Sequence, residues 1–275
     1  FFNDTAPTEI STLSLPDALP ISRLFLLDGM ALAYRAHFAF LRNPLSTSKG
    51  QPTSAVFGFL LTLDRVLAQE QPERLAVVFD AQEPTFRHKE YPEYKATRDK
   101  MPDELVPQLV WIEKIVKAMG LPFLRERGYE ADDVIGTLAR REAARGHDVW
   151  IVSGDKDMMQ LVGPRVRLYN LLKPRDGQPE LVDAERVVEK FGVAPDRVID
   201  VLALMGDASD NVPGVPGVGD KTAVELVRTY GSVEEVLARA PDLPRKALAS
   251  RLVEHAHLAR LSKRLVTIDT QVPLH

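Results

Sequence analysis

Three short apolar runs in this chain each lead into aspartate residues. The runs cover residues 24–27, 75–79 and 149–152 and are rich in Val, Ile, Leu and Phe. The acids that follow them are Asp28, Asp80, Asp155 and Asp157. Runs of this length and composition, separated by helical stretches, predict buried parallel strands. Because ligands of an open α/β sheet bind beyond the carboxyl ends of its strands, these acids are expected to meet in one crevice.

Five further acids stand in two helical stretches and complete a set of nine clustered carboxylates. They are Glu130, Asp132, Asp133, Asp207 and Asp210. So many carboxylates in one place raise one another's pKa values unless cations neutralise them. Carboxylate oxygens are hard ligands that suit Mg²⁺ or Mn²⁺. The clusters therefore predict a divalent-metal site.

Each cluster also has an ordinary structural explanation. An aspartate after a strand often closes a turn or caps a helix. Acids in a first helical turn favour the helix dipole, and Asp207 and Asp210, three residues apart, would share one helix face. The joint occurrence of the clusters favours a single metal site over several independent explanations.

The composition narrows the class of protein. The 275 residues, 45% hydrophobic and 27% charged, suit a soluble globular chain of one large or two modest domains. The absence of cysteine excludes disulfides, thiolate zinc sites and a cysteine nucleophile. No apolar stretch of the sequence approaches the length of a membrane span.

Residues 1–22 differ from the rest of the chain. They contain three acids and no Lys or Arg, and they lack the basic start and apolar core of a signal peptide. Their amino-acid sequence resembles a translated sequencing adapter joined to a truncated gene. We therefore treat them as an extraneous or disordered leader and leave them out of the fold prediction. A mitochondrial-type leader is the alternative, which the absence of Arg disfavours.

A basic segment with interleaved aromatic residues covers residues 83–104. Its basic residues are Arg87, Lys89, Lys95, Arg98 and Lys100, and its aromatic residues are Phe86, Tyr91 and Tyr94. Basic side chains pair with phosphates while aromatic faces stack on bases, as expected for binding unpaired nucleic acid. The alternative is a solvated loop, because three acids in the same segment nearly cancel its charge.

Glycines and prolines are concentrated at residues 211–223. Gly214, Gly217 and Gly219 precede Lys221 and Thr222 at the start of a predicted helix. Small residues let backbone approach a phosphate, and the N–H groups at a helix start can bind it. Such contacts fix the position of a nucleic acid without reading its sequence. An ordinary turn between helices is the alternative, and we favour DNA binding.

The order of patterns predicts a mostly parallel sheet with helices on both faces, followed by a helical region. Strand and helix patterns alternate up to about residue 165, and strand signals fade after residue 168. Helices are predicted at residues 31–39, 54–69, 105–119, 133–145, 183–191, 198–205, 221–229, 232–239 and 246–262.

Taken together, the motifs match a known family. They are Leu-Leu-Asp-Gly at 26–29, Val-Phe-Asp at 78–80, Phe-Arg at 86–87, Tyr-Pro-Glu-Tyr-Lys-Ala at 91–96, Tyr-Glu-Ala-Asp-Asp at 129–133, Ser-Gly-Asp-Lys-Asp at 153–157 and Met-Gly-Asp-Ala-Ser-Asp-Asn at 205–211. From Arg23 to the end, the chain resembles the 5′-nuclease domain of bacterial DNA polymerase I, within the flap endonuclease superfamily. No acidic position departs from that pattern.

The resemblance implies roles for the acids at two metal-ion sites, occupied by Mg²⁺ or Mn²⁺. Ligands of the first site would be Asp28, Asp80, Glu130 and Asp132. Asp133 would lie between the sites. Ligands of the second site, partly through water, would be Asp155, Asp157, Asp207 and Asp210.

The resemblance also implies how DNA is held. Lys95 and Arg98 would be catalytic residues of a helical gateway that meets the scissile phosphate. Further DNA contacts would come from Arg87, Tyr91, Tyr94, Gly214, Gly217, Gly219, Lys221 and Thr222. The hairpin at 211–223 would be a helix-three-turn-helix element that grips the duplex backbone and holds K⁺.

The implied architecture is a PIN-like nuclease core at residues 23–182, with the gateway segment at 83–104, and a helical DNA-binding subdomain at 183–275. The implied activity is that of a structure-specific 5′-3′ exonuclease and flap endonuclease with a two-metal-ion mechanism. Substrates would be flapped, nicked or 5′-ended DNA and RNA primer strands. We expect a monomer in the bacterial cytoplasm, associated with the nucleoid and without a membrane partner.

Alternatives remain open at this point. The chain could belong to a whole polymerase, with the polymerase domains missing from the C-terminus, or to a stand-alone 5′ nuclease. A branched-DNA-binding module without catalysis would keep the hairpin and the basic segment but could dispense with the nine acids. A phosphatase acting on small molecules could use strand-end acids but would have no use for a duplex-gripping hairpin.

Overall fold

The computed structural model describes residues 22–175 and 178–274. Our prediction for residues 1–22 therefore falls almost entirely outside the described part of the chain. The statements below concern the described residues.

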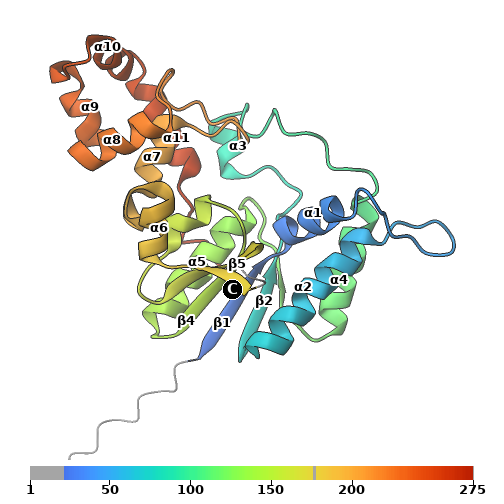
Figure 1. Ribbon diagram of the computed structural model, residues 1–275. Coiled ribbons are helices and arrows are strands. Elements are labelled where there is room, and N and C mark those ends of the chain that lie inside the picture. Colours follow the sequence, from blue (N-terminus) through green and yellow to red (C-terminus); the bar gives the residue numbers. More distant parts are fainter. Residues whose placement is uncertain (1–21, 176–177, 275) are drawn as a thin grey trace, which may run out of the picture.

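A six-stranded sheet runs through the described residues in the order β3-β2-β1-β4-β5-β6 (Figure 1). The strands are β1 (Arg23–Asp28), β2 (Arg74–Val78), β3 (Phe123–Leu124), β4 (Asp148–Val152), β5 (Val166–Arg175) and β6 (Gln178–Val182). All neighbouring pairs are parallel except β5 and β6. Asp28 is in register with Val78, and Leu27 with Val152, so β1, β2 and β4 end at the same edge.

Helices pack on both faces of the sheet, as predicted. The helices of the N-terminal part are α1 (Gly29–Ala39), α2 (Ser54–Glu70), α3 (Phe86–Glu90), α4 (Val106–Ala118) and α5 (Ala131–Ala144). Phe25 and Leu27 of β1 face the core that includes α1, α2 and α4. Leu24 and Leu26, which alternate with them, face the core that includes α5. Figure 1 shows α2 and α4 on one side of the sheet and α5 on the other.

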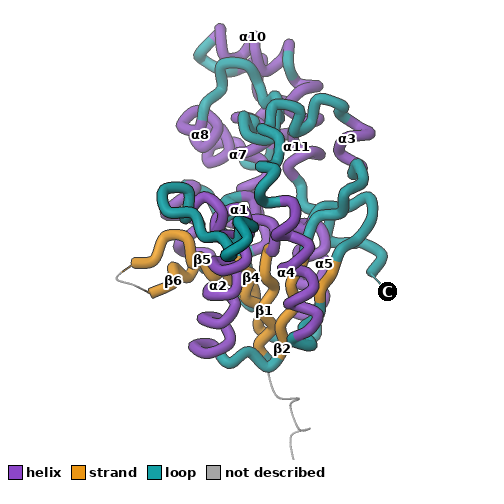
Figure 2. Tube along the Cα trace, turned by 90° about the vertical axis from the view of Figure 1, so that its right-hand side faces the viewer, coloured by secondary structure: helices purple, strands orange, loops and turns teal. Residues whose placement is uncertain are grey.

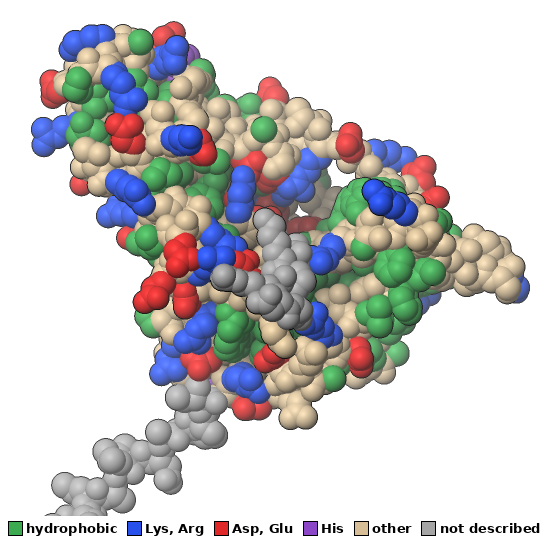
Figure 3. Space-filling model, in the orientation of Figure 1, with side chains coloured by type: hydrophobic (Ala, Val, Ile, Leu, Met, Phe, Trp, Pro, Cys, Tyr) green, Lys and Arg blue, Asp and Glu red, His purple; other side chains and the backbone are tan. Residues whose placement is uncertain are grey.

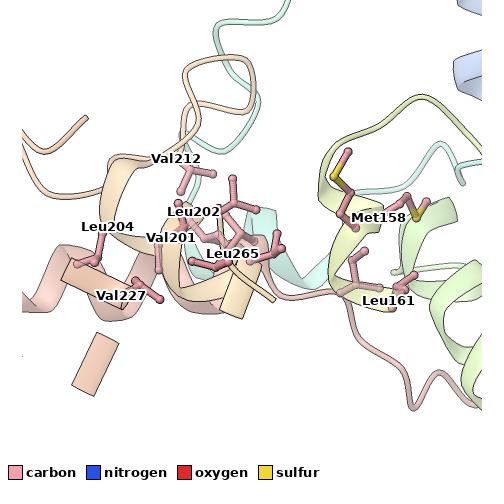
Figure 4. Packing of buried hydrophobic residues seen from close by; sticks show 14 of the residues in the cluster. Met158, Leu161, Val201, Leu202, Leu204, Val212, Val227 and Leu265 are labelled. Carbon is pink, nitrogen blue, oxygen red and sulfur yellow. The ribbon is translucent and has the colours of Figure 1, made fainter. Parts of the chain in front are cut away.

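The C-terminal part is helical and shares the core on the α5 side. Its helices are α6 (Ala184–Phe191), α7 (Val198–Met205), α8 (Asp220–Tyr230), α9 (Val233–Arg239), α10 (Lys246–Glu254) and α11 (Ala256–Val266), and short 3₁₀ helices are η1 (Asp157–Leu161), η2 (Pro195–Arg197) and η3 (Ala240–Asp242). Figure 2 shows this helical region stacked beyond the sheet edge. Met158 and Leu161 of η1 belong to the same buried cluster as Leu202 and Leu265 (Figure 4). No helix in the described ranges is long and apolar enough to cross a membrane.

Several features differ from the sequence prediction, which contained neither β3 nor α3. The predicted helix at 246–262 is two helices, because His255, with φ −104° and ψ 21°, breaks the helical hydrogen bonding between them. Strands also continue beyond residue 168, where β5 and β6 form an antiparallel pair at the end of the sheet. Edge strands such as β6 are half exposed and lack a continuous apolar run, so their signal in the sequence is weak.

Candidate active site

Asp28 and Asp80 are fixed by backbone groups at the carboxyl edge of the sheet. Asp28 ends β1 and caps α1, because its Oδ1 accepts a hydrogen bond from Ala31 N at 3.0 Å. Its Oδ2 accepts one from Ser153 Oγ at 3.0 Å, which ties β1 to the turn after β4. Asp80 Oδ1 accepts from Ala131 N at 2.8 Å and so joins the end of β2 to the start of α5. Asp28 is therefore a helix cap, and its predicted role as a metal ligand stays a prediction.

The start of α5 brings three more acids to this edge. Glu130 precedes the helix in a capping box with Asp133, whose Oδ2 accepts from Glu130 N at 3.0 Å. Asp132 faces the other clusters, since Asp155 and Asp28 both contribute to raising its pKa after the larger effect of burial. The structure thus brings acids from β1, α5 and the turn after β4 within electrostatic reach of one another.

Burial and mutual repulsion disfavour the charged forms of these carboxylates unless a cation is close by. Burial, then Asp80 and Asp155, raise the pKa of Asp28 to about 7, against hydrogen bonds that lower it. Burial and the neighbouring Asp155 raise the pKa of Asp157 to about 8. Burial also raises the pKa of Asp80. A bound cation would reverse these shifts by favouring the charged forms.

One buried oxygen lacks a partner. Asp157 Oδ1 and Trp150 Nε1 are the buried side-chain polar atoms that make no hydrogen bond in the described part of the chain. An orphaned carboxylate oxygen beside other acids fits a cation ligand. As the side chains stand in the described ranges, no group of three or more acids or histidines is placed to hold a metal ion. The oxygen donors themselves are of the kind that suits a divalent cation.

Basic side chains of the gateway segment contact the acids directly. Lys95 Nζ lies 2.7 Å from Glu130 Oε1, and Arg98 Nε donates to Asp210 Oδ1 at 3.1 Å. Tyr94 Oη lies 3.2 Å from Glu130 Oε2 and 3.1 Å from Asp210 Oδ2, so its single proton can be donated to either carboxylate. The structure therefore brings together segments that are more than a hundred residues apart in sequence. Figure 3 shows acidic and basic side chains side by side around a hollow between the helical region and the sheet.

A cavity of about 950 Å³ contains most of the predicted site. Its lining includes Asp28, Asp80, Glu130, Asp132, Asp155, Asp157, Asp210, Lys95 and Arg98. Asp207 is instead held by Lys156 Nζ at 2.8 Å. Burial is the largest effect and would raise the pKa of Asp207, but the hydrogen bonds from Lys156 and Ser209 and the charge of Lys156 together outweigh it and lower that pKa.

Sequence reasoning missed several residues around this cavity. Met30, Tyr34 and Phe38 of α1 line it and are spaced four residues apart, so they share one helix face. The four-residue spacing in the helix that follows Asp28 could have indicated that these side chains lie on one helix face near the acids. Lys156 was also missed, although it stands between the predicted ligands Asp155 and Asp157.

Three predicted site residues are almost completely buried. Arg87 is only 2% exposed and makes a bidentate ion pair with Asp133, and its predicted DNA contact stays a prediction. Asp133 is fully buried and both of its oxygens accept hydrogen bonds, and its predicted place between the metal sites stays a prediction. Tyr94 is 4% exposed, and its predicted DNA contact stays a prediction. Tyr91 is half-buried, and its predicted role remains a prediction.

The glycine-rich hairpin leads into α8 as predicted, but its glycines differ in environment. Gly214 has φ +60°, and a Cβ there would lie 2.4 Å from Gly206 N. Gly217 has φ +78°, and a Cβ there would lie 2.3 Å from an Arg251 guanidinium nitrogen. Gly219, at the N-cap of α8, has open space around it. Only the last glycine leaves room for a ligand, and its DNA role, like those of Lys221 and Thr222, remains a prediction.

Two family models match the chain. One, described as "5′-3′ exonuclease, N-terminal resolvase-like domain", matches residues 23–192. The other, described as "5′-3′ exonuclease, C-terminal SAM fold", matches residues 193–275. Our division at residues 182 and 183 was drawn from patterns alone and remains a prediction.

Curated relatives include polymerases and a shorter exonuclease. The DNA polymerase I of Pseudomonas aeruginosa is 47% identical over 258 residues, which cover 91% of this chain and 28% of that protein. The DNA polymerase I of Bacillus caldotenax is 42% identical over 252 residues, covering 92% of this chain and 28% of that protein. A 5′-3′ exonuclease of Aquifex aeolicus is 48% identical over 214 residues, covering 78% of this chain and 72% of that protein. The chain thus spans less than a third of the polymerases it matches.

Solved structures show the same fold. A T5 5′-exonuclease with bound zinc ions superposes with a TM-score of 0.73 at 22% identity, covering 90% of both chains. The catalytic core of Rad2 in complex with a DNA substrate superposes with a TM-score of 0.56 at 15% identity, covering 91% of this chain and 80% of that one. At these identities the likeness establishes the fold.

Proposed function

Because the chain belongs to the 5′-3′ exonuclease family, we propose that it hydrolyses DNA phosphodiesters at free 5′ ends and flaps with two Mg²⁺ or Mn²⁺ ions. The observation that carries this proposal is the convergence of carboxylates from β1, β2, α5 and the turn after β4 on one cavity. The contacts of Lys95 and Arg98 with these acids support it.

The acids of the cavity would hold the ions in two groups. Asp28, Asp80, Glu130 and Asp132 would hold the first, and Asp155, Asp157, Asp207 and Asp210 the second. When bound, such ions lower the pKa of water and neutralise charge on the attacking and leaving oxygens. The raised pKa values of Asp28 and Asp157 support this assignment. Neighbouring carboxylates can all be charged at once only when a cation neutralises their repulsion.

The chain's own basic groups would act on the substrate phosphate. Lys95 is about one-fifth exposed and Arg98 about half exposed, both beside the cavity, so each can turn from its carboxylate to a phosphate oxygen. Fixed positive charge where negative charge develops stabilises a transition state by roughly 3 kcal/mol per donor. Tyr34 and Phe38 line the same cavity and offer aromatic faces to an unpaired base.

The substrate would be recognised by shape. The N-terminus of α8, with open space at Gly219 and an exposed Lys221, is suited to a duplex phosphate. The Rad2 core is in complex with DNA, which supports DNA as the partner of this fold. We extend the proposal to RNA primer strands, K⁺ at the hairpin, a monomeric state and action at the cytoplasmic nucleoid.

The proposal is tested with the whole chain and three 5′-labelled DNAs: flapped, nicked and single-stranded. We expect Mg²⁺-dependent cleavage of flapped and nicked DNA that stops in EDTA. Asp155→Asn should abolish cleavage, because it removes a charge while keeping the acceptor for Asp157 N at 2.9 Å. Asp148→Asn, the same change at the opposite end of β4, is the matched control and should cleave normally.

Two outcomes would contradict the proposal. Cleavage by Asp155→Asn equal to that of the parent would exclude the acid cluster as the catalytic site. Hydrolysis of free nucleotides without cleavage of flapped DNA would indicate a small-molecule phosphatase, and tight binding of branched DNA without any hydrolysis would indicate a binding module.

A further inference from the structure

A buried stretch of chain passes between two acid-bearing elements. Residues 265–272, which we call the strap, leave the end of α11 and cross between α5 and η1. Thr267 is extended, with φ −74° and ψ 122°, and no neighbouring strand pairs with this stretch in the described sheet. Its backbone is held by side chains instead. The strap is therefore fixed relative to the elements that carry those side chains.

Two side chains from different elements bind the start of the strap. Arg87 donates to Leu265 O and to Thr267 O, both at 2.8 Å. Gln160 of η1 donates to Val266 O at 2.9 Å and accepts from Ile268 N at 2.9 Å. The strap's carbonyls therefore alternate between Arg87 on one side and Gln160 on the other.

The helix α5 binds the continuation of the strap. Asp133 Oδ1 accepts from Asp269 N at 2.8 Å while its carboxylate also holds Arg87. Thr137, one turn further along α5, donates to Asp269 O at 3.3 Å and accepts from Val272 N at 3.1 Å. The strap is thus joined to α5 over one full helical turn.

These polar partners are almost completely buried. Arg87, Asp133 and Gln160 are 2%, 0% and 5% exposed. Buried polar groups are costly unless every one is bonded, and in some proteins they fix the relative positions of the elements that carry them. Because these buried polar groups are hydrogen-bonded to the strap, the strap is suited to fixing the relative positions of the elements that carry them.

The packing of Gly136 is consistent with a close fit. A Cβ at this position would lie 2.6 Å from Ile268 Cγ2 and 3.3 Å from Leu161 Cδ2. Glycine inside a helix is about 1 kcal/mol less favourable than alanine. The absence of a side chain at this point of α5 lets the strap and η1 approach the helix closely.

The strap links the acids of the two proposed metal sites. Asp132 is the second residue of α5, and η1 begins with Asp157. Gln160 Nε2 also donates to Asp157 O at 2.9 Å, so the strap's partner holds the backbone of a proposed ligand. The helix α11 before the strap reaches the hairpin side, where Ser262 Oγ accepts from Gly214 N at 2.9 Å.

We propose that the strap sets the separation between the acids at the start of α5 and those at η1, and that Arg87, Asp133 and Gln160 are positioning residues for cleavage. This inference rests on the proposed function. None of the three positioning residues needs to touch DNA or a metal ion. Gln160 acts through the backbone of the strap and of η1, whereas Arg87 and Asp133 bind the strap and also contact Glu130, a proposed ligand.

The test compares two buried glutamines. Gln160→Met removes the hydrogen bonds to the strap while keeping the length of the side chain. Gln108→Met is the matched control: Gln108 is 1% exposed, accepts from Ala55 N at 2.8 Å and donates to Glu104 O at 2.8 Å, away from the strap. Both variants lose buried hydrogen bonds of the same kind, so their melting temperatures should fall to a similar extent.

Only Gln160→Met should lose function. Calorimetric titration of the free protein with Mn²⁺ should show affinity weakened by about tenfold or more, the size typical of lost support for a ligand. Single-turnover cleavage of flapped DNA should slow by a similar factor, while DNA affinity in EDTA stays unchanged. Equal Mn²⁺ affinities in the two variants would overturn the role of the strap.

A second pair of variants tests the fit without touching a hydrogen bond. Gly136→Ala should push on Ile268 and weaken Mn²⁺ binding, although alanine favours the helix. Adding Ile268→Ala removes the obstructing Cγ2 and should restore Mn²⁺ binding despite a further loss of stability. Unchanged Mn²⁺ affinity in Gly136→Ala, or no recovery in the double variant, would contradict the inference.

The strap and the proposed function can fail separately. If the parent binds Mn²⁺ but cleaves no DNA, the proposed function fails while the Mn²⁺ comparison still decides the strap. If the parent cleaves DNA and the two glutamine variants behave alike, the strap fails alone. A parent that binds no Mn²⁺ would overturn both.

Discussion

The carboxylate of Asp80 accepts a hydrogen bond from the backbone N–H of Ala131 at 2.8 Å. The acid at the end of β2 therefore fixes the first turn of α5, which carries Asp132. Asp28 does the same for α1 through Ala31 N. In both places the local structural role and the proposed chemical role fall on the same side chain, so the two must be separated by experiment.

Asp80→Asn should separate them. Asparagine keeps an oxygen that can accept from Ala131 N but carries no charge. Because burial raises the pKa of Asp80, its charged form is unfavourable in the fold, and the metal-free variant should be at least as stable as the parent. Cleavage should fall by about 100-fold or more, beyond the usual effect of changing only a ligand's neighbour.

Asp80→Ala is the comparison. It removes the acceptor as well and leaves Ala131 N unpaired, which costs about 1 to 3 kcal/mol. Urea unfolding in EDTA measures the difference between the two variants. If Asp80→Asn cleaves flapped DNA at the parent rate, Asp80 is only a structural cap.

The stability of the metal-free protein should fall as the pH rises. The folded pKa values of Asp28, about 7, and Asp157, about 8, lie above the ordinary value of 3.8, so the folded state binds more protons between these limits. Stability then decreases with pH in that window. Divalent cations bind the deprotonated acids, so the stabilisation they give should grow over the same range.

Melting temperatures between pH 5 and 8.5, in EDTA and in Mg²⁺, measure both trends, and we expect the two curves to diverge above about pH 6. Asp157→Asn should flatten the EDTA curve, because it removes one of the raised groups. Parallel curves would mean that the cation does not bind these acids.

Much of this site could be predicted because each strand end is a local feature. The runs before Asp28, Asp80 and Asp155 give the strands, and parallel pairing brings their ends to one edge. The contact of Lys95 with Glu130 spans only 35 residues and lies within motifs that the family shares. Local pattern and family resemblance together were sufficient there.

The strap could not be predicted in the same way. Arg87 and Leu265 are 178 residues apart, and nothing in a basic, aromatic segment indicates that one arginine will be buried. Arg87 therefore looked like a phosphate contact. Gln160 and Gly136 gave no signal, because a single glutamine or glycine in a helix has many ordinary explanations. The environment of these residues depends on contacts between distant segments of the fold, so a local sequence pattern does not predict it.

Lys95→Ala and Arg98→Ala should each slow single-turnover cleavage by about 100-fold or more, as expected for a lost donor to developing charge. DNA affinity should change much less. Lys100→Ala is the control, since Lys100 is 84% exposed in side chain and pairs with Asp103 outside the cavity. A loss of affinity as large as the loss of rate would make Lys95 and Arg98 phosphate anchors only.

Arg87→Met should destabilise the fold strongly and leave no separate DNA-binding defect. The variant would leave the buried carboxylate of Asp133 without its partner, and removing one partner of a buried ion pair costs about 3 to 5 kcal/mol of stability. Combining it with Asp133→Asn should recover part of that loss, as urea unfolding would show. A stable Arg87→Met variant that binds DNA weakly would contradict this expectation and support Arg87 as a DNA contact.

Gly219→Val and Lys221→Ala should both weaken binding to duplex-containing DNA whatever its sequence. Gly219 has open space and an ordinary φ of −91°, so valine should fold there while blocking the approach of a phosphate to the start of α8. Gly163→Val, at another glycine with open space, is the matched control and should bind normally. Lys221→Ala should reduce the salt slope of binding by about one unit, the loss of one phosphate contact. If Gly219→Val binds flapped and nicked DNA as tightly as Gly163→Val does, the hairpin is a structural turn and the duplex is held elsewhere.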